Sequence, residues 1–255
     1  LAQCWYAKAQ GFERVTTETG AGQWGTALAY AAAVTGLKCT VFWVRSVYNW
    51  KQDRLRLMRL LGADVYPSPS PMTEFGKSLY DKNPEHVGSL GIAISEGLEA
   101  AQKDPKAIYC LGSVLNHVLM HQTIIGLETQ KQFEILGEYP EIVISCLGGG
   151  SNFGGFALPF FGDVFKKGKK IVFIAAQSQV APNLQGEYRY DFADYAEMTP
   201  MLKMYTLGHT FVPPGIHAGG RGLHRIEDVE TRGDELRDQL HHRSAGVDEG
   251  LPAGV

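Results

Sequence analysis

Short strand-like runs alternate with longer stretches of helical periodicity along most of this 255-residue chain. The strand-like runs are β-branched or apolar, and they include CTVFWVR, ADVYPS, EIVISCL and KKIVFIAAQ. Between them lie helical stretches such as QWGTALAYAAAVTG and GIAISEGLEAAQKD. This alternation predicts an α/β fold in which a parallel sheet carries helices on both faces. In such sheets, ligands bind where the strands end and the helices begin.

The first junction of this kind is the glycine-rich loop ETGAGQWG, which follows the strand-like ERVTTE. Gly20, Gly22 and Gly25 match the G-x-G-x-x-G pattern of dinucleotide-binding folds. That interpretation also needs an acidic residue for a ribose at the end of the next strand, where this chain has Arg45. The alternative is a site for a substrate carboxylate on the amides from Thr19 to Gln23, because a helix N-terminus favours any anion.

Glu18 stands directly before this loop. A carboxylate beside a site for an anionic ligand is unfavourable unless it has a task such as proton transfer. The alternative is a solvated or ion-paired glutamate at a strand end, which is the commoner role of this residue type. Glu18 is therefore a candidate acid/base group.

The second junction is Gly148-Gly149-Gly150-Ser151-Asn152, between the apolar EIVISCL and another helical stretch. Three consecutive glycines cost conformational entropy, so a close backbone approach to a ligand is expected. Their amides, the start of a helix and the side chains of Ser151 and Asn152 suit a monophosphate. The G-K-[ST] ending of a nucleotide-binding P-loop is missing. The alternative is a glycine turn that serves packing alone.

Composition argues against several other classes of function. The 24 basic and 27 acidic residues nearly balance, so we expect no nucleic acid or anionic membrane as a partner. Four widely spaced cysteines indicate reduced thiols in a cytoplasmic protein, and no metal site is expected from them. His117 and His121 are spaced for one helix face, but Val118 stands where an H-E-x-x-H site has glutamate, so we interpret them as ordinary helix residues.

Taken together, these motifs resemble a family of pyridoxal-phosphate (PLP) enzymes, the tryptophan synthase β-like family, and its second type in particular. The resemblance rests on ETGAGQWG, GGGSN, PSPSP, HVGSLGIAISE, LGSVLNHVLMHQT, GEYRYD, MTPMLKMYTLGH and FVPP, from Leu1 to about Gly220. It implies fold type II, with two three-layer α/β domains that have parallel-type sheets and enclose the cofactor. Residues 1–125 would form the N-terminal domain with the mobile substrate-carboxylate region. Residues 126–220 would begin the phosphate-binding C-terminal domain.

The resemblance also implies a role for each matching residue. Glu18 would be the acid/base that helps the hydroxyl of L-serine to leave and then assists attack by indole, and we expect burial to raise its pKa. The other implied site residues are Thr19, Gly20, Ala21, Gly22, Gln23 and Trp24 for the substrate carboxylate, Gly112 and Ser113 for the cofactor pocket, and Gly148, Gly149, Gly150, Ser151 and Asn152 for the PLP phosphate. A homodimer is expected for the full-length parent, and an α-subunit partner is left open.

Several features depart from the family pattern. The lysine that binds PLP covalently would lie about five residues before Leu1, and Lys8 reads as solvated. The chain starts within a helical pattern, without methionine or an N-cap residue, so we expect it to be cut there. The family pattern also stops at Gly220, so we expect a fragment that is incomplete at both ends. Gln177 stands where the family usually has glutamate. Residues 221–255 form an atypical charged tail, disordered or artefactual, without strand-like runs and with at most one solvated helix over IEDVETRGDELRDQL.

These departures keep other functions open. One is a different fold type II reaction, such as that of a serine deaminase or a sulfhydrylase. Another is a catalytically dead remnant that binds ligands without lysine chemistry. An oxidoreductase with NAD on the first glycine loop is a more distant alternative. Trp24, where the classical β chain has histidine, favours the β-replacement of serine by indole.

Overall fold

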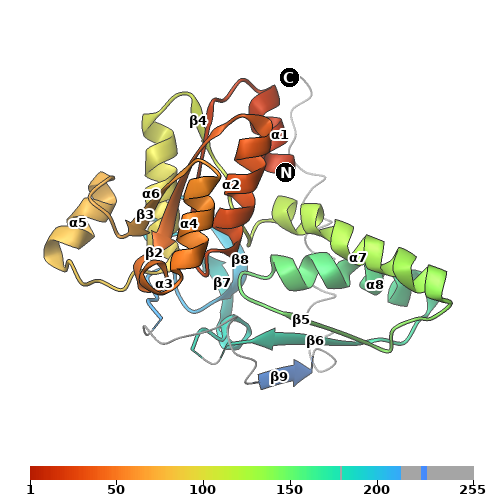
Figure 1. The fold of residues 1–255 in the computed structure, drawn as a ribbon. Coiled ribbons are helices and arrows are strands. Elements are labelled where there is room, and N and C mark those ends of the chain that lie inside the picture. The colour runs from red at the N-terminus through yellow and green to blue at the C-terminus, as the bar shows by residue number, and fades with distance from the viewer. Residues whose placement is uncertain (179, 214–224, 229–255) are drawn as a thin grey trace, which may run out of the picture.

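The computed structural model describes residues 1–178, 180–213 and 225–228, and Figure 1 shows two sheet-based parts joined side by side. The first part is built on a four-stranded parallel sheet in the order β3-β2-β1-β4. Its strands are β1 (Arg14–Thr19), β2 (Lys38–Val44), β3 (Ala63–Ser68) and β4 (Ala107–Tyr109). Its helices are α1 (Ala2–Ala9), α2 (Gln23–Thr35), α3 (Arg45–Trp50), α4 (Gln52–Leu60), α5 (Glu74–Lys82) and α6 (Leu90–Lys103).

Strand β1 is the buried centre of this sheet. Its β-branched residues suit a strand covered on both faces, and five of its six residues are buried. Successive side chains point to opposite faces. Thr16 faces α6 and donates to the Gly97 carbonyl, whereas Thr19 faces α2 and accepts from the Gly25 amide. Glu18 therefore shares the α6 face of the sheet with Thr16.

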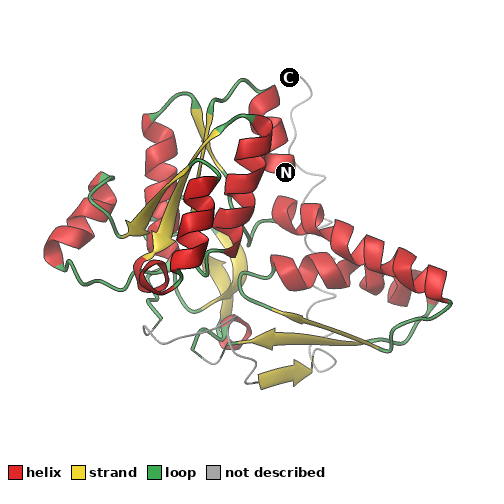
Figure 2. Cartoon of the chain, viewed as in Figure 1, coloured by secondary structure: helices red, strands yellow, loops and turns green. Residues whose placement is uncertain are grey.

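The second part packs two long helices on a smaller sheet, as the secondary-structure view shows (Figure 2). It contains α7 (Asn116–Leu136), β5 (Ile142–Cys146), α8 (Ser151–Lys167) and β6 (Val172–Gln177). Gly126 and Gly155 let α7 and α8 approach closely, since a Cβ atom at Gly155 would lie 2.4 Å from the Gln122 Cβ atom. Phe153 and Phe160 are buried in the core beneath them. These aromatic residues pack the core.

Helix α7 runs without a break through the expected domain boundary at residue 125. It packs along α8, so the chain leaves the first sheet earlier, over the short segment Gly112–Leu115. Val114 in this segment has a positive φ of 74°, which is rare for a β-branched residue.

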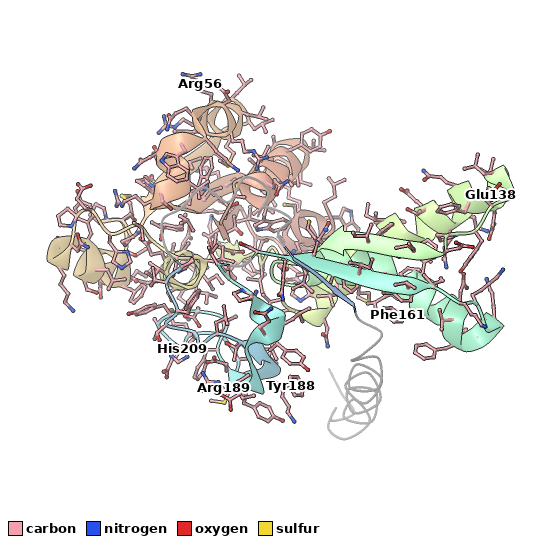
Figure 3. All side chains as sticks on the ribbon, turned by 90° about the horizontal axis from the view of Figure 1, so that it is seen from below. Arg56, Glu138, Phe161, Tyr188, Arg189 and His209 are labelled. Carbon is pink, nitrogen blue, oxygen red and sulfur yellow. The ribbon has the colours of Figure 1, made fainter. Side chains whose placement is uncertain are left out.

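The 3₁₀ helix η1 (Asn183–Gln185) and the antiparallel hairpin of β7 (Glu187–Asp191) and β8 (Leu202–Thr206) follow β6. The loop of this hairpin returns to the first part: Asp194 is fully buried and accepts from Ser95 of α6. In the view from below, Tyr188, Arg189 and His209 lie together, far from Glu138 at the distal end of α7 (Figure 3). The hairpin thus connects the second part to α6.

The described part of the charged tail is strand β9 (Arg225–Asp228), which pairs antiparallel with β6. The expectation of no strand after Gly220 is therefore wrong at these four residues. The physical reason is that the edge of β6 presents unpaired backbone N–H and C=O groups. These groups can pair with another segment whatever its side chains are. The remainder of the tail lies outside the described residues. Among the helices of the described ranges, none is both long and apolar enough to cross a bilayer.

Candidate functional site

Glu18 lies at the carboxyl end of β1, with its side chain buried at 3% exposure. Three donors approach its carboxyl group, among them the Thr17 hydroxyl at 3.3 Å from Oε2. The Gly112 amide donates to Oε1 at 3.2 Å, and the Tyr109 hydroxyl donates to Oε2. The residue is therefore neither solvated nor paired with a cation in a described contact, contrary to the alternative of an ordinary strand-end glutamate.

Burial changes the acidity of this carboxyl. Removal from water raises the pKa of Glu18 to about 7, although the hydrogen bonds from Tyr109 and Gly112 oppose the rise by stabilising the ionised form. A group with a pKa near neutrality can both donate and accept a proton under ordinary conditions. The upward direction of the pKa is the one that the sequence predicts.

Side chains from β2 and α4 hold the loop after Glu18 by donating to its carbonyl groups. The indole N–H of Trp43 donates to the Gly20 carbonyl at 2.9 Å, and the Arg54 guanidinium donates to the Ala21 carbonyl at 2.8 Å. Gly22 is the N-cap of α2 with φ 86°, and a Cβ atom there would lie 2.5 Å from the Trp43 ring. With the carbonyl groups held in this way, the amides of Ala21, Gly22 and Gln23 donate to no acceptor among the described residues. They remain available for an anion.

Arg45 does not contact this loop through any described hydrogen bond. Its guanidinium donates to the Pro69 carbonyl and lies over the Tyr80 ring, 5.1 Å from the ring centroid. The dinucleotide interpretation needs an acidic group at the position of Arg45 to bind a ribose, or a cation there to bind a ribose phosphate. Arg45 is not an acid, and its described contacts hold its guanidinium at Pro69 and Tyr80.

The Trp24 side chain contacts strand β1 and Gly112. Its indole N–H donates to the Thr17 hydroxyl at 2.6 Å, and its ring covers Gly112, where a Cβ atom would lie 2.5 Å from the ring. Thr17 in turn donates to the Cys110 carbonyl at 2.5 Å. The ring therefore supports the backbone of residues 110–112.

The second glycine loop connects β5 to α8. Gly150 is the N-cap of α8 with φ 99°, and the space beside it is open, since a Cβ atom there would meet nothing within 4 Å. The amides of Gly149 and Gly150 donate to no acceptor among the described residues. Asn183 fixes the loop from the other side by donating to the Gly148 carbonyl at 2.7 Å. Free amides at the start of a 17-residue helix form a site for an anion.

Two side chains of this loop differ in their surroundings. Ser151 is buried, and its hydroxyl is 2.9 Å from the Ser113 hydroxyl and accepts from Gln122. The Asn152 side chain turns back to β5 and donates to Ser145 and to the Cys146 carbonyl. The side-chain amide bonds to the end of β5, so its N–H groups are not available to a ligand. Asn152 therefore offers a ligand its backbone rather than the side-chain donor that the sequence suggests.

Gly112 and Ser113 join the two loops. The amide of the first binds Glu18 and the hydroxyl of the second binds Ser151, so adjacent residues contact both sites. The structure thereby brings together groups that lie more than 90 positions apart in the sequence, such as Glu18 and Gly112.

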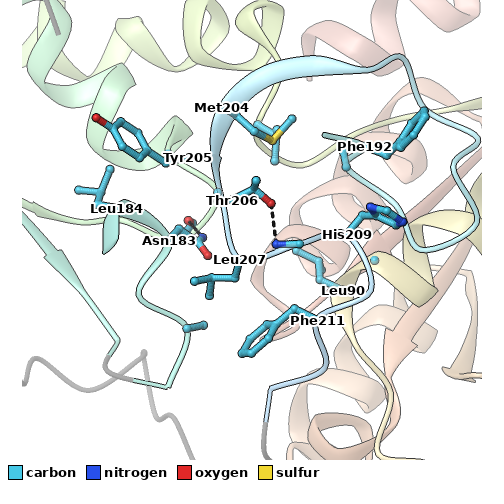
Figure 4. Close-up of a pocket in the computed structure, with 18 of the residues that line it drawn as sticks. Leu90, Asn183, Leu184, Phe192, Met204, Tyr205, Thr206, Leu207, His209 and Phe211 are labelled. Atoms are coloured by element: carbon cyan, nitrogen blue, oxygen red, sulfur yellow. Dashed lines mark hydrogen bonds between the residues drawn. The ribbon is translucent and has the colours of Figure 1, made fainter. Parts of the chain in front are cut away.

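A cavity of about 350 Å³ opens beside the second loop (Figure 4). Leu90 and Gly91 at the start of α6 form one wall, and Gly148 to Gly150 form another. The remaining wall is largely apolar and comes from η1, the hairpin and the segment after it; it includes Leu184, Phe192, Met204, Leu207 and Phe211. A Cβ atom at Gly20 would contact Leu90, so the cavity and the first loop share this side chain.

Comparison with known proteins follows this geometry. A family model described as "Pyridoxal-phosphate dependent enzyme" matches residues 2–222. The chain belongs to this family. It is 57% identical to tryptophan synthase beta chain 2 of Methanothermobacter thermautotrophicus, over 88% of this chain and 52% of that protein. It is also 55% identical to tryptophan synthase beta chain 2 of Pyrococcus furiosus, over 89% of this chain and 51% of that protein.

The chain thus spans about half the length of the relatives that it matches. Solved structures of lower identity share its fold. A hydrogen sulfide-producing enzyme superposes with a TM-score of 0.54 at 16% identity, covering 85% of this chain and 56% of that chain. A threonine deaminase superposes with a TM-score of 0.50 at 20% identity, covering 71% and 51%. The fold type II α/β architecture predicted from the sequence is confirmed.

The residues of the second loop fit the phosphate of PLP. The free amides of Gly149 and Gly150, the open space at Gly150 and the neighbouring hydroxyls of Ser113 and Ser151 suit a dianion. Lys8 is exposed on α1, as the sequence predicts, and has no described contact with either loop. His117 and His121 lie together on α7 with ring centroids 5.9 Å apart, and among the described residues they belong to no cluster of three metal-ligating side chains.

Several residues of the site escape prediction from the sequence. Tyr109 reads as a core aromatic in a short strand, and Arg54 and Trp43 read as helix-surface and core residues. The wall of the cavity from residues 184–211 has no motif of its own, because its members share only apolar character. The one feature that could have indicated Tyr109 is its place on the strand that pairs with β1, which ends close to Glu18.

Proposed function

We propose that the protein containing this chain catalyses PLP-dependent β-replacement of the L-serine hydroxyl by indole, giving L-tryptophan and water. The observation that carries the proposal is a buried Glu18, its pKa raised to about 7, that is linked through Gly112 and Ser113 to two glycine loops with free amides. The similarity to tryptophan synthase beta chains supports the choice of substrates.

The chain's own residues divide the work of this reaction. The amides of Ala21, Gly22 and Gln23 bind the serine carboxylate, and the positive end of α2 strengthens that bond. The second loop binds the phosphate and so fixes the cofactor. When bound, PLP supplies the electron sink that stabilises negative charge on the substrate carbon.

Glu18 moves the proton. In its neutral form it donates a proton to the departing serine hydroxyl, and in its ionised form it accepts the proton released when indole adds. Since the hydroxyls of Tyr109 and Thr17 both donate to Oε2 and only the Gly112 amide donates to Oε1, we place the transferred proton on Oε1. Exclusion of water around the buried carboxyl strengthens both steps.

The cavity beside the second loop accounts for an apolar second substrate. Away from the glycine loop, its wall of leucine, methionine and phenylalanine suits a flat aromatic molecule. The glycine loop together with Asn183, Thr206 and His209 forms the polar side of the cavity. Leu90 joins this cavity to the serine-binding loop, so the two substrates lie next to each other.

The test is to supply the full-length protein with PLP and L-serine, with and without indole. We expect tryptophan with indole present, and little pyruvate. Pyruvate as the main product would favour a deaminase, and a product from sulfide but none from indole would favour a sulfhydrylase. Failure to bind PLP at all would support the dead remnant.

A further inference from the structure

Each oxygen of the Glu18 carboxyl accepts from a donor in the segment 109–112, and Oε2 also accepts from Thr17 at 3.3 Å. Tyr109 ends β4, which pairs with β1 so that Tyr109 stands opposite Thr16. Gly112 follows three positions later. The hydroxyl of the first reaches Oε2 and the amide of the second reaches Oε1. The carboxyl group is thereby fixed in rotation as well as in place.

The Tyr109 ring is itself held in position. It packs against Gly97 of α6, where a Cβ atom would lie 2.8 Å from the ring Cε2 atom. The adjacent Gly97 carbonyl accepts from Thr16, so α6 and β1 are joined at this point. Burial and the nearby Glu18 carboxyl raise the pKa of Tyr109 well above its usual value, so the hydroxyl keeps its proton and remains a donor.

The Gly112 amide is supported by Trp24. The indole ring lies on Gly112, and its N–H reaches Thr17, whose hydroxyl donates to the Cys110 carbonyl. These contacts fix the backbone on both sides of Leu111. Trp24 thus acts on Oε1 of Glu18 through the amide that it supports.

We propose that Tyr109 and Trp24 are positioning residues for Glu18, Tyr109 by direct donation to Oε2 and Trp24 by fixing the Gly112 amide on Oε1. The proposal rests on the acid/base role of Glu18 in the proposed function. It gives Trp24 a task different from binding the substrate carboxylate.

A donor to a carboxylate stabilises its ionised form, so loss of the donor makes the carboxyl harder to ionise. Hydrogen bonds to charged groups are strong enough to move a titration midpoint by about one to two pH units. Tyr109→Phe removes only the hydroxyl. Trp24→Phe removes the N–H and keeps an aromatic ring near Gly112, so we expect a smaller rise.

The experiment is a carbon-13 NMR titration of glutamate side-chain carboxyls in this chain, with Glu18 assigned by its loss in Glu18→Gln. In the unsubstituted chain we expect a midpoint near pH 7. Tyr109→Phe should raise it by about one to two pH units and Trp24→Phe by less. Tyr30→Phe, on the exposed face of α2, is the matched control and should leave it unchanged. Glu96, a second buried glutamate, bonded to Ser70 and Thr73, serves as an internal reference.

If the Glu18 midpoint is unchanged in Tyr109→Phe, Tyr109 is not a positioning residue. If the Glu18 midpoint is unchanged in Trp24→Phe, Trp24 is not a positioning residue. If Tyr109→Phe does not fold, 3-fluorotyrosine at position 109 gives a second readout. Its fluorine resonance should move with the Glu18 midpoint and stop moving in Glu18→Gln, and a resonance insensitive to pH would contradict the contact. The titration needs no substrate, so shifted midpoints in a protein that forms no tryptophan would leave the positioning intact and refute only the proposed function.

Discussion

The two glycine loops begin their helices in the same way and are supported differently. Gly22 and Gly150 are both N-cap residues with left-handed backbone, at φ 86° and 99°. Gly22 is backed by the Trp43 ring, whereas Gly150 faces open space. The first loop is therefore packed against the core that also buries Glu18, whereas the second has open space beside its N-cap residue. The same local motif is supported differently because its surroundings differ.

Alanine at Gly22 should have the largest effect. The substitution adds left-handed backbone strain and a clash with the Trp43 ring, so we expect a loss of about 4 kcal/mol in the free energy of unfolding. Chemical denaturation of the chain measures it. A loss no greater than that of Gly150→Ala would mean that the two loops do not differ in support.

Glu18→Gln tests the burial that distinguishes the first loop. Burial raises the pKa of Glu18 from 4.5 to about 7, so its favourable contribution is present below pH 4.5 and is lost as pH rises through 7. Glutamine does not titrate. The variant should therefore gain about 3 kcal/mol relative to the unsubstituted chain between pH 4 and pH 8.

Urea denaturation at several pH values measures this difference, and Glu85→Gln, at an exposed glutamate, is the matched control. A difference between Glu18→Gln and the unsubstituted chain that stays constant with pH would show that Glu18 is not held in its neutral form.

Gly150→Ala should change stability least and ligand binding most. Its cost is backbone strain alone, about 1 to 2 kcal/mol, since the added methyl group meets nothing within 4 Å. The methyl group would enter the space where we propose that the phosphate binds, and PLP affinity of the full-length protein should then fall by about tenfold or more. Fluorescence titration with PLP measures it, and unchanged affinity would remove the phosphate from this loop.

Much of the fold and part of the site follow from local sequence. Strand β1 and helix α2 are visible in RVTTET and in the alanine-rich run after Gly22, because burial on two faces and helix propensity are local properties. Glu18 and both glycine loops are visible for the same reason. Tyr109 is not, because its partner is set by the β1–β4 pairing across 91 positions.

Trp24 and the tail show two other limits. The sequence places Trp24 in the loop, but the direction of its ring depends on the packing of Gly112 against α2. Strand β9 arises from the free edge of β6, a property of the neighbouring strand rather than of RIED itself. The direction of the Trp24 ring and the formation of β9 both depend on contacts with residues far away in the sequence.

The most direct test of the account is the rate of tryptophan formation by full-length Glu18→Gln loaded with PLP. The substitution keeps the size of the side chain and removes the transferable proton. The glutamine carbonyl oxygen accepts from the Gly112 amide, and its NH2 group faces the Tyr109 hydroxyl, which then accepts instead of donating. We predict unchanged PLP absorbance and a rate lower by about 10² to 10⁴-fold. A rate equal to that of the unsubstituted enzyme, with PLP bound, would contradict the assignment of Glu18 as the acid/base group.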